Sequence, residues 1–384
     1  MVADTILFGD IYRNKRVLVT GHTGFKGSWI CAWLTSMGAD VLGFSLAPNT
    51  NPNHFSLLEP DLAMQSVLGD IRDLDVLKKT FAEFQPEIVF HLAAQPLVRL
   101  SYDQPIETLH TNVIGTANVF EACRHTSSVR AIVNITSDKC YENREWVWGY
   151  RENDPMGGYD PYSASKGCAE LVTSAYRNSF FHPDQYGTSH NVLLASVRAG
   201  NVIGGGDWAR DRIVTDMMEA ANRDESFPIR NPGATRPWQH VLEPLSGYLL
   251  LGQRLLEGKI DCAGAWNFGP NDDGAITVLE VVKAMQKRWS RVHYAVQQSE
   301  HQLHEANLLK LDCSKARMQL HWKGIWDADT TFQETAEWYR TFYEHNRLLT
   351  FRQLGTYVHD ALVAGAVWVE SMTDRESAGQ DENG

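Results

Sequence analysis

Several features of nucleic-acid-binding and membrane proteins are missing from this 384-residue sequence. Basic residues are in deficit, with 35 Lys and Arg against 47 Asp and Glu, and the formal net charge is −12. This charge argues against a nucleic-acid or anionic-membrane surface. No apolar run approaches membrane-spanning length, and the N-terminus lacks the basic-then-apolar layout of a secretion signal. We therefore expect no nucleic-acid partner and no membrane association.

Signals for disulfides and metal sites are also absent. The six cysteines lie far apart without a C-x-x-C pair, which indicates reduced thiols in a cytoplasmic protein. Among the fourteen histidines, only His301 and His304 have a spacing that suggests ligands, and we expect this pair on a solvated face. No bound metal is expected. What remains is the composition of an ordinary globular protein, 43% hydrophobic and 21% charged.

Apolar strand-like runs alternate with helix-like segments in the first half of the chain. Predicted strands cover residues 16–20, 41–45, 64–70, 87–94, 130–137 and 191–200, and predicted helices cover 25–37, about 73–84, roughly 105–125 and about 161–181. Strands that are apolar on both faces and alternate with helices are typical of a parallel sheet covered on both sides. The fold class is therefore α/β, a doubly wound parallel sheet of the Rossmann type.

The alternation ends after Gly200, where glycines and prolines mark loops and the elements become shorter. We expect a dinucleotide-binding domain over residues 1–200, with some later segments, about 235–265, returning to it. A smaller α/β substrate-binding domain is expected over residues 201–350, closing over the carboxyl edge of the sheet. Residues 351–384 form an extension, and its final polar stretch, SMTDRESAGQDENG, is expected to be disordered.

A glycine-rich turn follows the first predicted strand. VTGHTGFKGSW places Gly21, Gly24 and Gly27 between that strand and the next helix. Glycines here allow a tight turn and let the backbone approach a pyrophosphate, which the helix N-terminus then stabilises. The spacing is G-x-x-G-x-x-G instead of the usual G-x-G-x-x-G, and a glycine-rich turn without a ligand is the alternative. The strand before and the helix after favour a dinucleotide.

The acidic residue expected after the second strand is missing. That strand ends at Ser45, and Asp40 lies at its other end. No Arg follows the strand to meet a 2′-phosphate, and this missing Arg is the only feature here that favours NAD over NADP. Asp70, after the third strand, could accept a hydrogen bond from the adenine amino group. It could equally cap the following helix, and both interpretations stay open.

DPYSASKGCAE places Tyr162 and Lys166 four residues apart, on one face of a helix. A tyrosine base at pH 7 needs its pKa lowered by about 3 units from 10, roughly 4 kcal/mol. A neighbouring ammonium group acts in that direction. Alone, this spacing is more typical of an amphipathic helix with a surface lysine, but together with the glycine turn and the polar strand end at Ser137 it indicates catalysis.

These motifs carry a family resemblance over about residues 14 to 345. The glycine spacing, HLAAQ, TNVIGT, a serine at a strand end and PYSASK resemble the extended short-chain dehydrogenase/reductases that act on nucleotide sugars. GHTGFKGSW, NITSDKCYEN, WGYRENDPMGGYDPYSASK and TRPWQHVLEPLSGYL resemble, within them, the CDP-glucose 4,6-dehydratase family. The resemblance implies a cytoplasmic NAD-dependent lyase that makes CDP-4-keto-6-deoxyglucose from CDP-glucose for the synthesis of deoxysugars, such as those of an O-antigen.

The resemblance also implies roles for individual residues. Tyr162 would take the proton of the sugar 4-hydroxyl while the C4 hydride passes to the nicotinamide, Lys166 would hold the nicotinamide ribose and lower the tyrosine pKa, and Ser137 would bind the 4-oxygen. The implied NAD site comprises Gly21, Gly24, Phe25, Lys26, Gly27, Ser45, Asp70, Ile71, Leu92, Ala93, Ala94, Tyr162 and Lys166. The implied substrate site comprises Gln95, Asn201 and Arg236, with Asn112 as a structural residue near the nicotinamide. Arg210 and Arg212 are further candidates for binding the diphosphate, and each could equally be a solvated helix residue.

Asp138 and Lys139 follow Ser137 directly and can supply the two further proton transfers that a dehydratase needs. Related dehydratases acting on dTDP-glucose carry Asp-Glu here, with the Glu as the C5 base. A neutral Lys139 would need its pKa lowered by roughly 3 units from about 10.4, and a charged Lys139 could instead stabilise the enolate while water or Tyr162 takes the proton. Adjacent strand residues point to opposite faces, so both side chains meet the substrate only if the chain turns here. A surface turn pair is the alternative.

Two other functions remain open on the residues alone. A nucleotide-sugar 4-epimerase, or a dehydratase for another nucleotide sugar, would share Ser137, Tyr162 and Lys166. A silent NAD-binding regulator could use the same fold, because a fold does not fix a function. The resemblance further suggests a homodimer or homotetramer formed through helices that flank the sheet.

Overall fold

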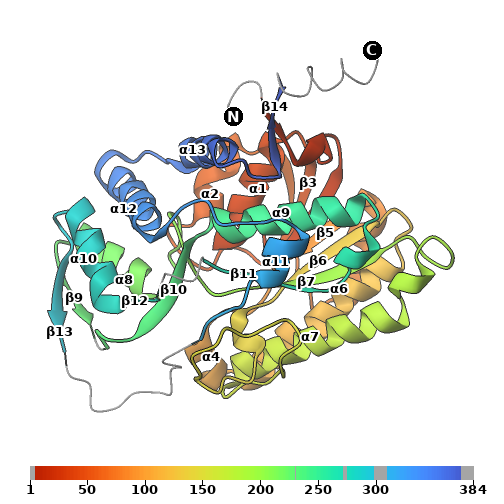
Figure 1. The fold of residues 1–384 in the computed structure, drawn as a ribbon, viewed down its shortest axis with the longest axis horizontal. Coiled ribbons are helices and arrows are strands. Elements are labelled where there is room, and N and C mark those ends of the chain that lie inside the picture. The colour runs from red at the N-terminus through yellow and green to blue at the C-terminus, as the bar shows by residue number, and fades with distance from the viewer. Residues whose placement is uncertain (1–4, 230, 271–274, 298–308, 373–384) are drawn as a thin grey trace.

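The computed structural model describes residues 5–229, 231–270, 275–297 and 309–372 (Figure 1). Its centre is a sheet of seven strands in the order β11-β7-β6-β5-β2-β3-β4, and every neighbouring pair is parallel. In that order these strands are Ala265–Phe268, Leu193–Ala199, Ala131–Ile135, Ile88–His91, Arg16–Thr20, Asp40–Ser45 and Met64–Leu68. The predicted doubly wound α/β fold is confirmed.

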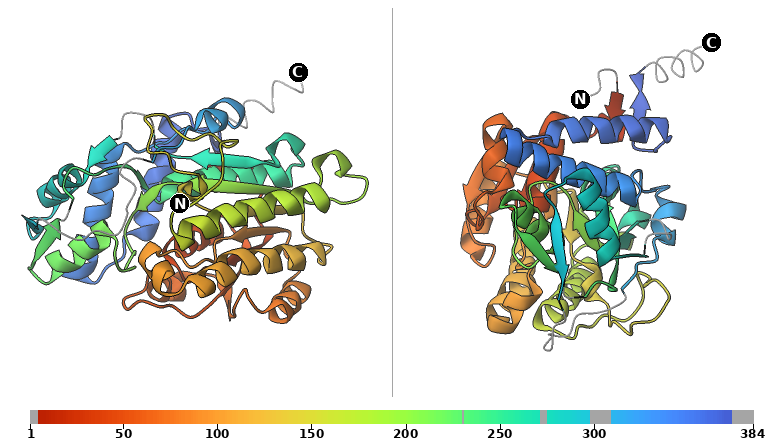
Figure 2. Two further views of the ribbon diagram at one scale, coloured as in Figure 1. Left: turned by 90° about the horizontal axis from the view of Figure 1, so that it is seen from below. Right: turned by 90° about the vertical axis from the view of Figure 1, so that its left-hand side faces the viewer.

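Alternation along each strand places side chains in two cores, one on either face of the sheet. Val17 and Val19 of β2 belong to the core that includes α1 (Phe25–Ser36) and α9 (Leu242–Leu256). Leu18 belongs to the opposite core, which helices on the other face complete. These helices are α3 (Leu74–Phe84), α6 (Gly115–Arg124) and α7 (Pro161–Ser179) (Figure 2). The strand order reverses between β2 and β5, which is where sheets of this type bind ligands.

Most predicted elements differ from the observed ones only at their ends. The strand predicted over 87–94 ends at His91, because the chain turns away from the sheet there. The helix predicted over 105–125 is three consecutive pieces: α5 (Pro105–Leu109), a π-helical stretch (His110–Ile114) and α6. A further helix, α4 (Val98–Asp103), was not predicted.

Smaller sheets lie at one end of the main sheet, beyond the carboxyl ends of its strands (Figure 1). One has the order β12-β10-β8 and the other pairs β13 with β9. The elements of this region are β8 (Asn201–Ile203), α8 (Ile213–Asn222), β9 (Ser226–Ile229), β10 (Thr235–His240), β12 (Ala275–Thr277), α10 (Val278–Arg288), β13 (His293–Val296) and α12 (Ala328–His345). Between them in sequence, α9 and β11 belong to the main sheet and its cover, so the chain crosses between the two regions more than once.

The C-terminal part of the described chain packs against α1. In α13 (Thr350–Val363), Tyr357 is fully buried against Trp33 of α1, and β14 (Val369–Ser371) pairs antiparallel with β1 (Thr5–Leu7). The remaining short helices are α2 (His54–Leu58) and α11 (Ser314–Gln319). Disorder was predicted for residues 371–384, which is wrong at Ser371, because this residue ends β14. Residues 373–384, His301 and His304 lie outside the described residues. In the described ranges, no helix is long and apolar enough to cross a bilayer, and no group of His, Cys, Asp and Glu could hold a metal.

Candidate active site

A cavity of about 1410 Å³ opens at the carboxyl ends of the sheet strands and extends to the smaller sheets. Ligand sites usually occupy ~300–1,000 Å³, so this cavity has room for more than one small molecule. Its lining includes all the predicted catalytic and cofactor residues and four of the five predicted substrate residues. The predicted site residues are therefore brought together, with Gln95 as the exception.

The glycine turn has the geometry of a cradle for phosphate. Gly21 has a φ of +77°, and a Cβ on it would lie 2.7 Å from the backbone nitrogen of Ala93. A Cβ on Gly27 would lie 2.0 Å from the carbonyl oxygen of Gly21, so both positions require glycine for packing. A Cβ on Gly24 would meet its nearest neighbour, that same oxygen, at 3.3 Å. Gly24 faces the cavity at the start of α1, where the first N–H groups have no partner within the helix. This cradle fits a dinucleotide pyrophosphate.

Asp70 lines the cavity but is already engaged by Arg72. Its carboxylate accepts from the backbone N–H of Arg72 at 2.9 Å and from the guanidinium at 2.5 Å, and these bonds lower the pKa of Asp70. The capping interpretation of Asp70 is wrong, because Asp73 caps α3 by accepting from the Val76 N–H at 3.1 Å. At the end of β3, Ser45 is hydrogen-bonded to Thr23 of the glycine turn, with 2.9 Å between the hydroxyl oxygens.

The polar strand end at Ser137 is a turn. After β6 the chain enters a 3-10 turn over Asp138–Cys140, and the Ser137 hydroxyl accepts from the Lys139 N–H at 3.3 Å. The same hydroxyl donates to Asp138 Oδ1 at 3.0 Å. The turn lets Asp138 and Lys139 both line the cavity, which an extended strand would prevent.

Tyr162 and Lys166 project into the same cavity from the first turns of α7. Asp160 caps this helix by accepting from the N–H of Ser163 at 2.9 Å, and Pro161 occupies its first position. Both functional side chains are buried. The sequence spacing therefore places the phenol and the amine where the glycine turn and the Ser137 turn converge.

Burial dominates the electrostatics of this cluster. It raises the pKa of Tyr162 to about 12, against a lowering by the hydrogen bond with Ser137. Burial also lowers the pKa of Lys166 to about 8. It raises the pKa of Asp138, and the charge of the nearby Lys139 opposes this rise. The expected lowering of the tyrosine pKa is thus not found, because loss of hydration, together with Asp138 and Asp160, outweighs the hydrogen bond with Ser137 and the charge of Arg212.

Lys26, in the glycine turn, extends toward this cluster. Its ammonium nitrogen lies 6.0 Å from the ring centroid of Tyr248. Loss of hydration and the charge of Arg212 lower the pKa of Lys26 to about 8, and Asp138 opposes both.

Four predicted substrate residues lie at the far side of the cavity. Asn201 begins β8, Arg236 lies in β10, and Arg210 and Arg212 precede α8. Arg212 donates to Asp207 at 2.5 Å, which fixes its position, and sequence reasoning missed this aspartate.

Gln95 does not join them and is not among the described residues that line the cavity. Its side-chain amide donates to Leu97 O at 3.0 Å and to the Thr108 hydroxyl at 2.8 Å, so the substrate role predicted for it is replaced by a role in the loop. Asn112 supports the same loop, accepting from the Gln95 N–H at 2.8 Å and donating to Ser165 of α7 at 2.8 Å.

We compared the chain with families and individual proteins of known function. A family model described as GDP-mannose 4,6 dehydratase matches residues 18–336. The chain belongs to this family. A curated CDP-glucose 4,6-dehydratase from Salmonella typhimurium is 53% identical to this dehydratase-family chain, over 91% of the chain and 98% of the relative's length. The predicted resemblance is confirmed.

Solved structures support the fold of this dehydratase-family member. MoeE5, solved in complex with UDP-glucose and NAD, superposes with a TM-score of 0.70 at 24% identity, covering 85% of this chain and 99% of its own. The epimerase Mth375 from Methanothermobacter thermautotrophicus has a TM-score of 0.75 at 23% identity, covering 90% of this chain and 96% of its own. Identities this low speak for the fold alone.

Proposed function

We propose that this protein is a lyase that converts CDP-glucose to CDP-4-keto-6-deoxyglucose. The observation that carries the proposal is the 3-10 turn that brings Asp138 and Lys139 into one cavity with Ser137, Tyr162 and Lys166. A 4-epimerase needs the last three residues but not the first two. The choice of CDP-glucose rests on the relative of that name, which is 53% identical over nearly its whole length.

The cofactor is NAD, held by the glycine turn. Gly24 and the start of α1 would hold the pyrophosphate, and Ser45, Asp70 and Ile71 would border the adenosine. Leu92, Ala93 and Ala94 would form the opposite wall, and Lys166 would hold the nicotinamide ribose. When bound, NAD would supply the hydride acceptor for C4 of the sugar and the hydride donor for C6, so the net reaction is loss of water.

Tyr162, Ser137 and Asp138 form a path for the proton released at C4. With a pKa of about 12, the Tyr162 phenol is neutral near pH 7 and accepts the 4-hydroxyl proton only as it gives up its own. Ser137 is hydrogen-bonded to Tyr162, and its hydroxyl donates to Asp138 Oδ1 at 3.0 Å. The proton therefore ends on Asp138, whose pKa burial raises. Asp138 is then in the protonated form that a general acid requires.

Elimination uses that same proton. The 4-ketone acidifies the C5 hydrogen, and we assign its removal to Lys139, which lines the cavity beside Asp138. Asp138 protonates the departing 6-hydroxyl, so one water leaves and Asp138 is again a carboxylate. The proton held by Lys139 returns to C5 as C6 is reduced, and the residues end in their starting states.

The diphosphate of the substrate is assigned to Arg210, Arg212 and Arg236, with Asn201 beside them. One guanidinium group can donate to two phosphate oxygens at once. Because the chain has a net charge of −12, it needs such cations close to the site where it binds an anion.

A product assay tests this function. The protein with catalytic NAD is incubated in turn with CDP-glucose, UDP-glucose, dTDP-glucose and GDP-mannose, and the products are analysed by mass spectrometry. The proposal predicts loss of one water from CDP-glucose at the highest kcat/KM. An unchanged mass with altered stereochemistry at C4 would make the protein an epimerase, and a preference for another nucleotide would overturn the assigned substrate.

The proposal also covers the compartment in which the enzyme acts and its oligomeric state. We place it in the cytoplasm as a homodimer or homotetramer that supplies deoxysugar for O-antigen or similar polysaccharides. The six cysteines are free thiols, which suits a reducing compartment. Ile106 of α5 and Leu171 of α7 are large apolar side chains exposed on helices that flank the sheet, which suits an interface between subunits.

A further inference from the structure

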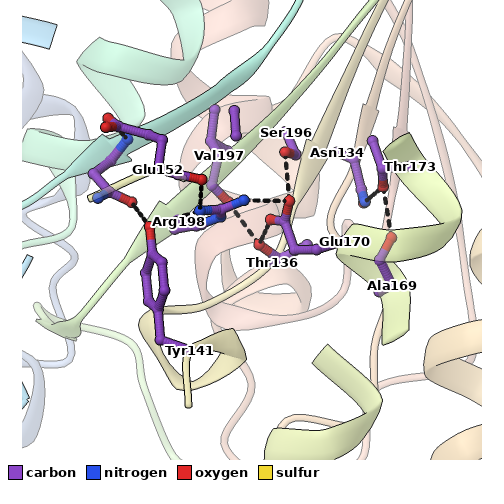
Figure 3. A network of polar contacts seen from close by, with 12 residues as sticks. Asn134, Thr136, Tyr141, Glu152, Ala169, Glu170, Thr173, Ser196, Val197 and Arg198 are labelled. Atoms are coloured by element: carbon purple, nitrogen blue, oxygen red, sulfur yellow. Dashed lines mark hydrogen bonds and ion pairs between the residues drawn. The ribbon is translucent and has the colours of Figure 1, made fainter. Parts of the chain in front are cut away.

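Helix α7 carries a third functional position in register with Tyr162 and Lys166. Glu170 follows Lys166 by four residues, so it lies one helical turn further along the same face. It is 5% exposed and faces Arg198 of β7, which is 3% exposed. The nearest side-chain atoms of this ion pair are 2.8 Å apart (Figure 3).

The Glu170 carboxylate is fully occupied by donors from neighbouring strands. Arg198 and the Ser196 hydroxyl donate to Oε2 at 2.8 and 2.7 Å, and the Thr136 hydroxyl donates to Oε1 at 2.5 Å. Thr136 is the residue immediately before Ser137. The helix that carries Tyr162 is therefore tied to the start of the turn that carries Asp138.

Arg198 ties down the other end of that turn. Its second terminal nitrogen donates to the Tyr141 hydroxyl at 2.6 Å and to the carbonyl oxygen of Glu152 at 3.0 Å. Tyr141 follows Cys140, the last residue of the turn, and its hydroxyl donates to Asn267 at 2.8 Å. In Figure 3, Tyr141 contacts the pair at Arg198, whereas Thr136 contacts it at the Glu170 carboxylate.

We propose that Glu170 and Arg198 are positioning residues that set the placement of the Ser137–Asp138–Lys139 turn relative to Tyr162 and Lys166. This inference deepens the proposed function, since it concerns the coupling of C4 oxidation to water elimination in that reaction. The pair acts through Thr136 and Tyr141, which join the two ends of the turn to the helix.

Stability alone is a weak reason for such a pair. Two buried charges must be stripped of water, and apolar residues of the same volume often serve a fold equally well. Here each group instead bonds to a residue that flanks the catalytic turn. The Glu170 carboxylate also acts on Lys166: burial lowers the pKa of Lys166 to about 8, whereas Cys140 and Glu170 raise it. Removing the carboxylate therefore lowers the Lys166 pKa further.

The main test uses Glu170→Gln and the double variant Glu170→Leu with Arg198→Met. Glu170→Gln leaves Arg198 buried without its partner, whereas the double variant removes both charges and keeps the volume. In both, we expect kcat to fall by about 100-fold, the cost typical of a misplacement near 1 Å. KM is expected to change by less than about threefold, and the alkaline limb of the pH profile to move to lower pH.

Matched controls separate positioning from folding. Thr173→Val removes a different contact between α7 and β6, the bond that Asn134 donates to the Thr173 hydroxyl at 2.8 Å, and should leave kcat and the alkaline limb as in the wild type (Figure 3). Tyr141→Phe removes the hydroxyl that accepts from Arg198 and donates to Asn267, and it should lower kcat by about tenfold at unchanged KM. If Glu170→Gln does not fold, the double variant and Tyr141→Phe still decide the question.

Two results would overturn the proposal: a folded double variant with wild-type kcat and alkaline limb, or wild-type kcat in Tyr141→Phe. Failure of the proposed function looks different, because the wild type itself would then not dehydrate CDP-glucose. The variants are in that event compared on the sugar that the wild type does process. The pKa of Lys166 is also measured without any sugar, by competitive acetylation across pH, and an unchanged value in Glu170→Gln would count against the proposal.

Discussion

Replacing Gly24 by alanine tests whether the glycine turn holds the cofactor. The backbone at this position suits alanine, because its φ and ψ of −80° and 170° are ordinary extended values, but the Gly21 carbonyl oxygen, 3.3 Å from the new Cβ, would have to shift slightly. The Cβ would also project where we place the pyrophosphate. A methyl group forced into a close contact costs about 1–3 kcal/mol, which lowers affinity by roughly 5- to 150-fold.

The assay is calorimetric titration of NAD into the wild type and Gly24→Ala, with the thermal midpoint Tm of each protein measured without cofactor. We expect the Tm to fall less than in Gly27→Ala and the affinity to fall within that range. Gly355→Ala is the matched control, since among the described residues a Cβ there meets nothing within 4 Å. Gly27→Ala should lower the Tm more, because its Cβ would overlap the Gly21 carbonyl at 2.0 Å. Wild-type affinity in Gly24→Ala would refute the placement of the pyrophosphate.

Three further predictions concern the chemistry. Tyr162→Phe should lower the rate of C4 oxidation by about 1,000-fold, as loss of a proton acceptor does, and rapid NADH formation in a single turnover of this variant would exclude its role. Asp138→Asn removes both the acceptor of the C4 proton and the acid for the 6-hydroxyl, so NADH formation, solvent exchange at C5 and water loss should each fall by about 100-fold; wild-type NADH formation in a single turnover of this variant would contradict the proton path through Ser137. Because the pKa of Lys166 is about 8, its ammonium form is present below that pH and lost above it, so kcat/KM should decline above about pH 8. An activity that stays level to about pH 10 would contradict this assignment.

The sequence was sufficient to predict the features that depend on local pattern. The apolar run over 16–20 and the glycines after it fixed the first strand, the turn and the start of α1. The i and i+4 spacing placed Tyr162 and Lys166 on one face because helix geometry dictates it. In each case the residues that make the feature are close together in the chain.

Features that depend on distant residues could not be predicted in this way. Gln95 sits in a motif that suggested substrate contact, yet its amide is used by Leu97 and Thr108. The pKa of Tyr162 is set by burial, which only the assembled cavity determines. Glu170 had a local signal, four residues after Lys166, but nothing in the sequence pairs it with Arg198, 28 positions away.

One measurement tests the central claim most directly. CDP-glucose is incubated with the purified protein and catalytic NAD in deuterated water, and the product is analysed by mass spectrometry and by the position of its label. Our account predicts a product that has lost one water and carries one deuterium at C5, the atom assigned to exchange through Lys139. A CDP-sugar that has lost no water would contradict the proposed dehydration, and loss of water without deuterium at C5 would contradict the exchange assigned to Lys139.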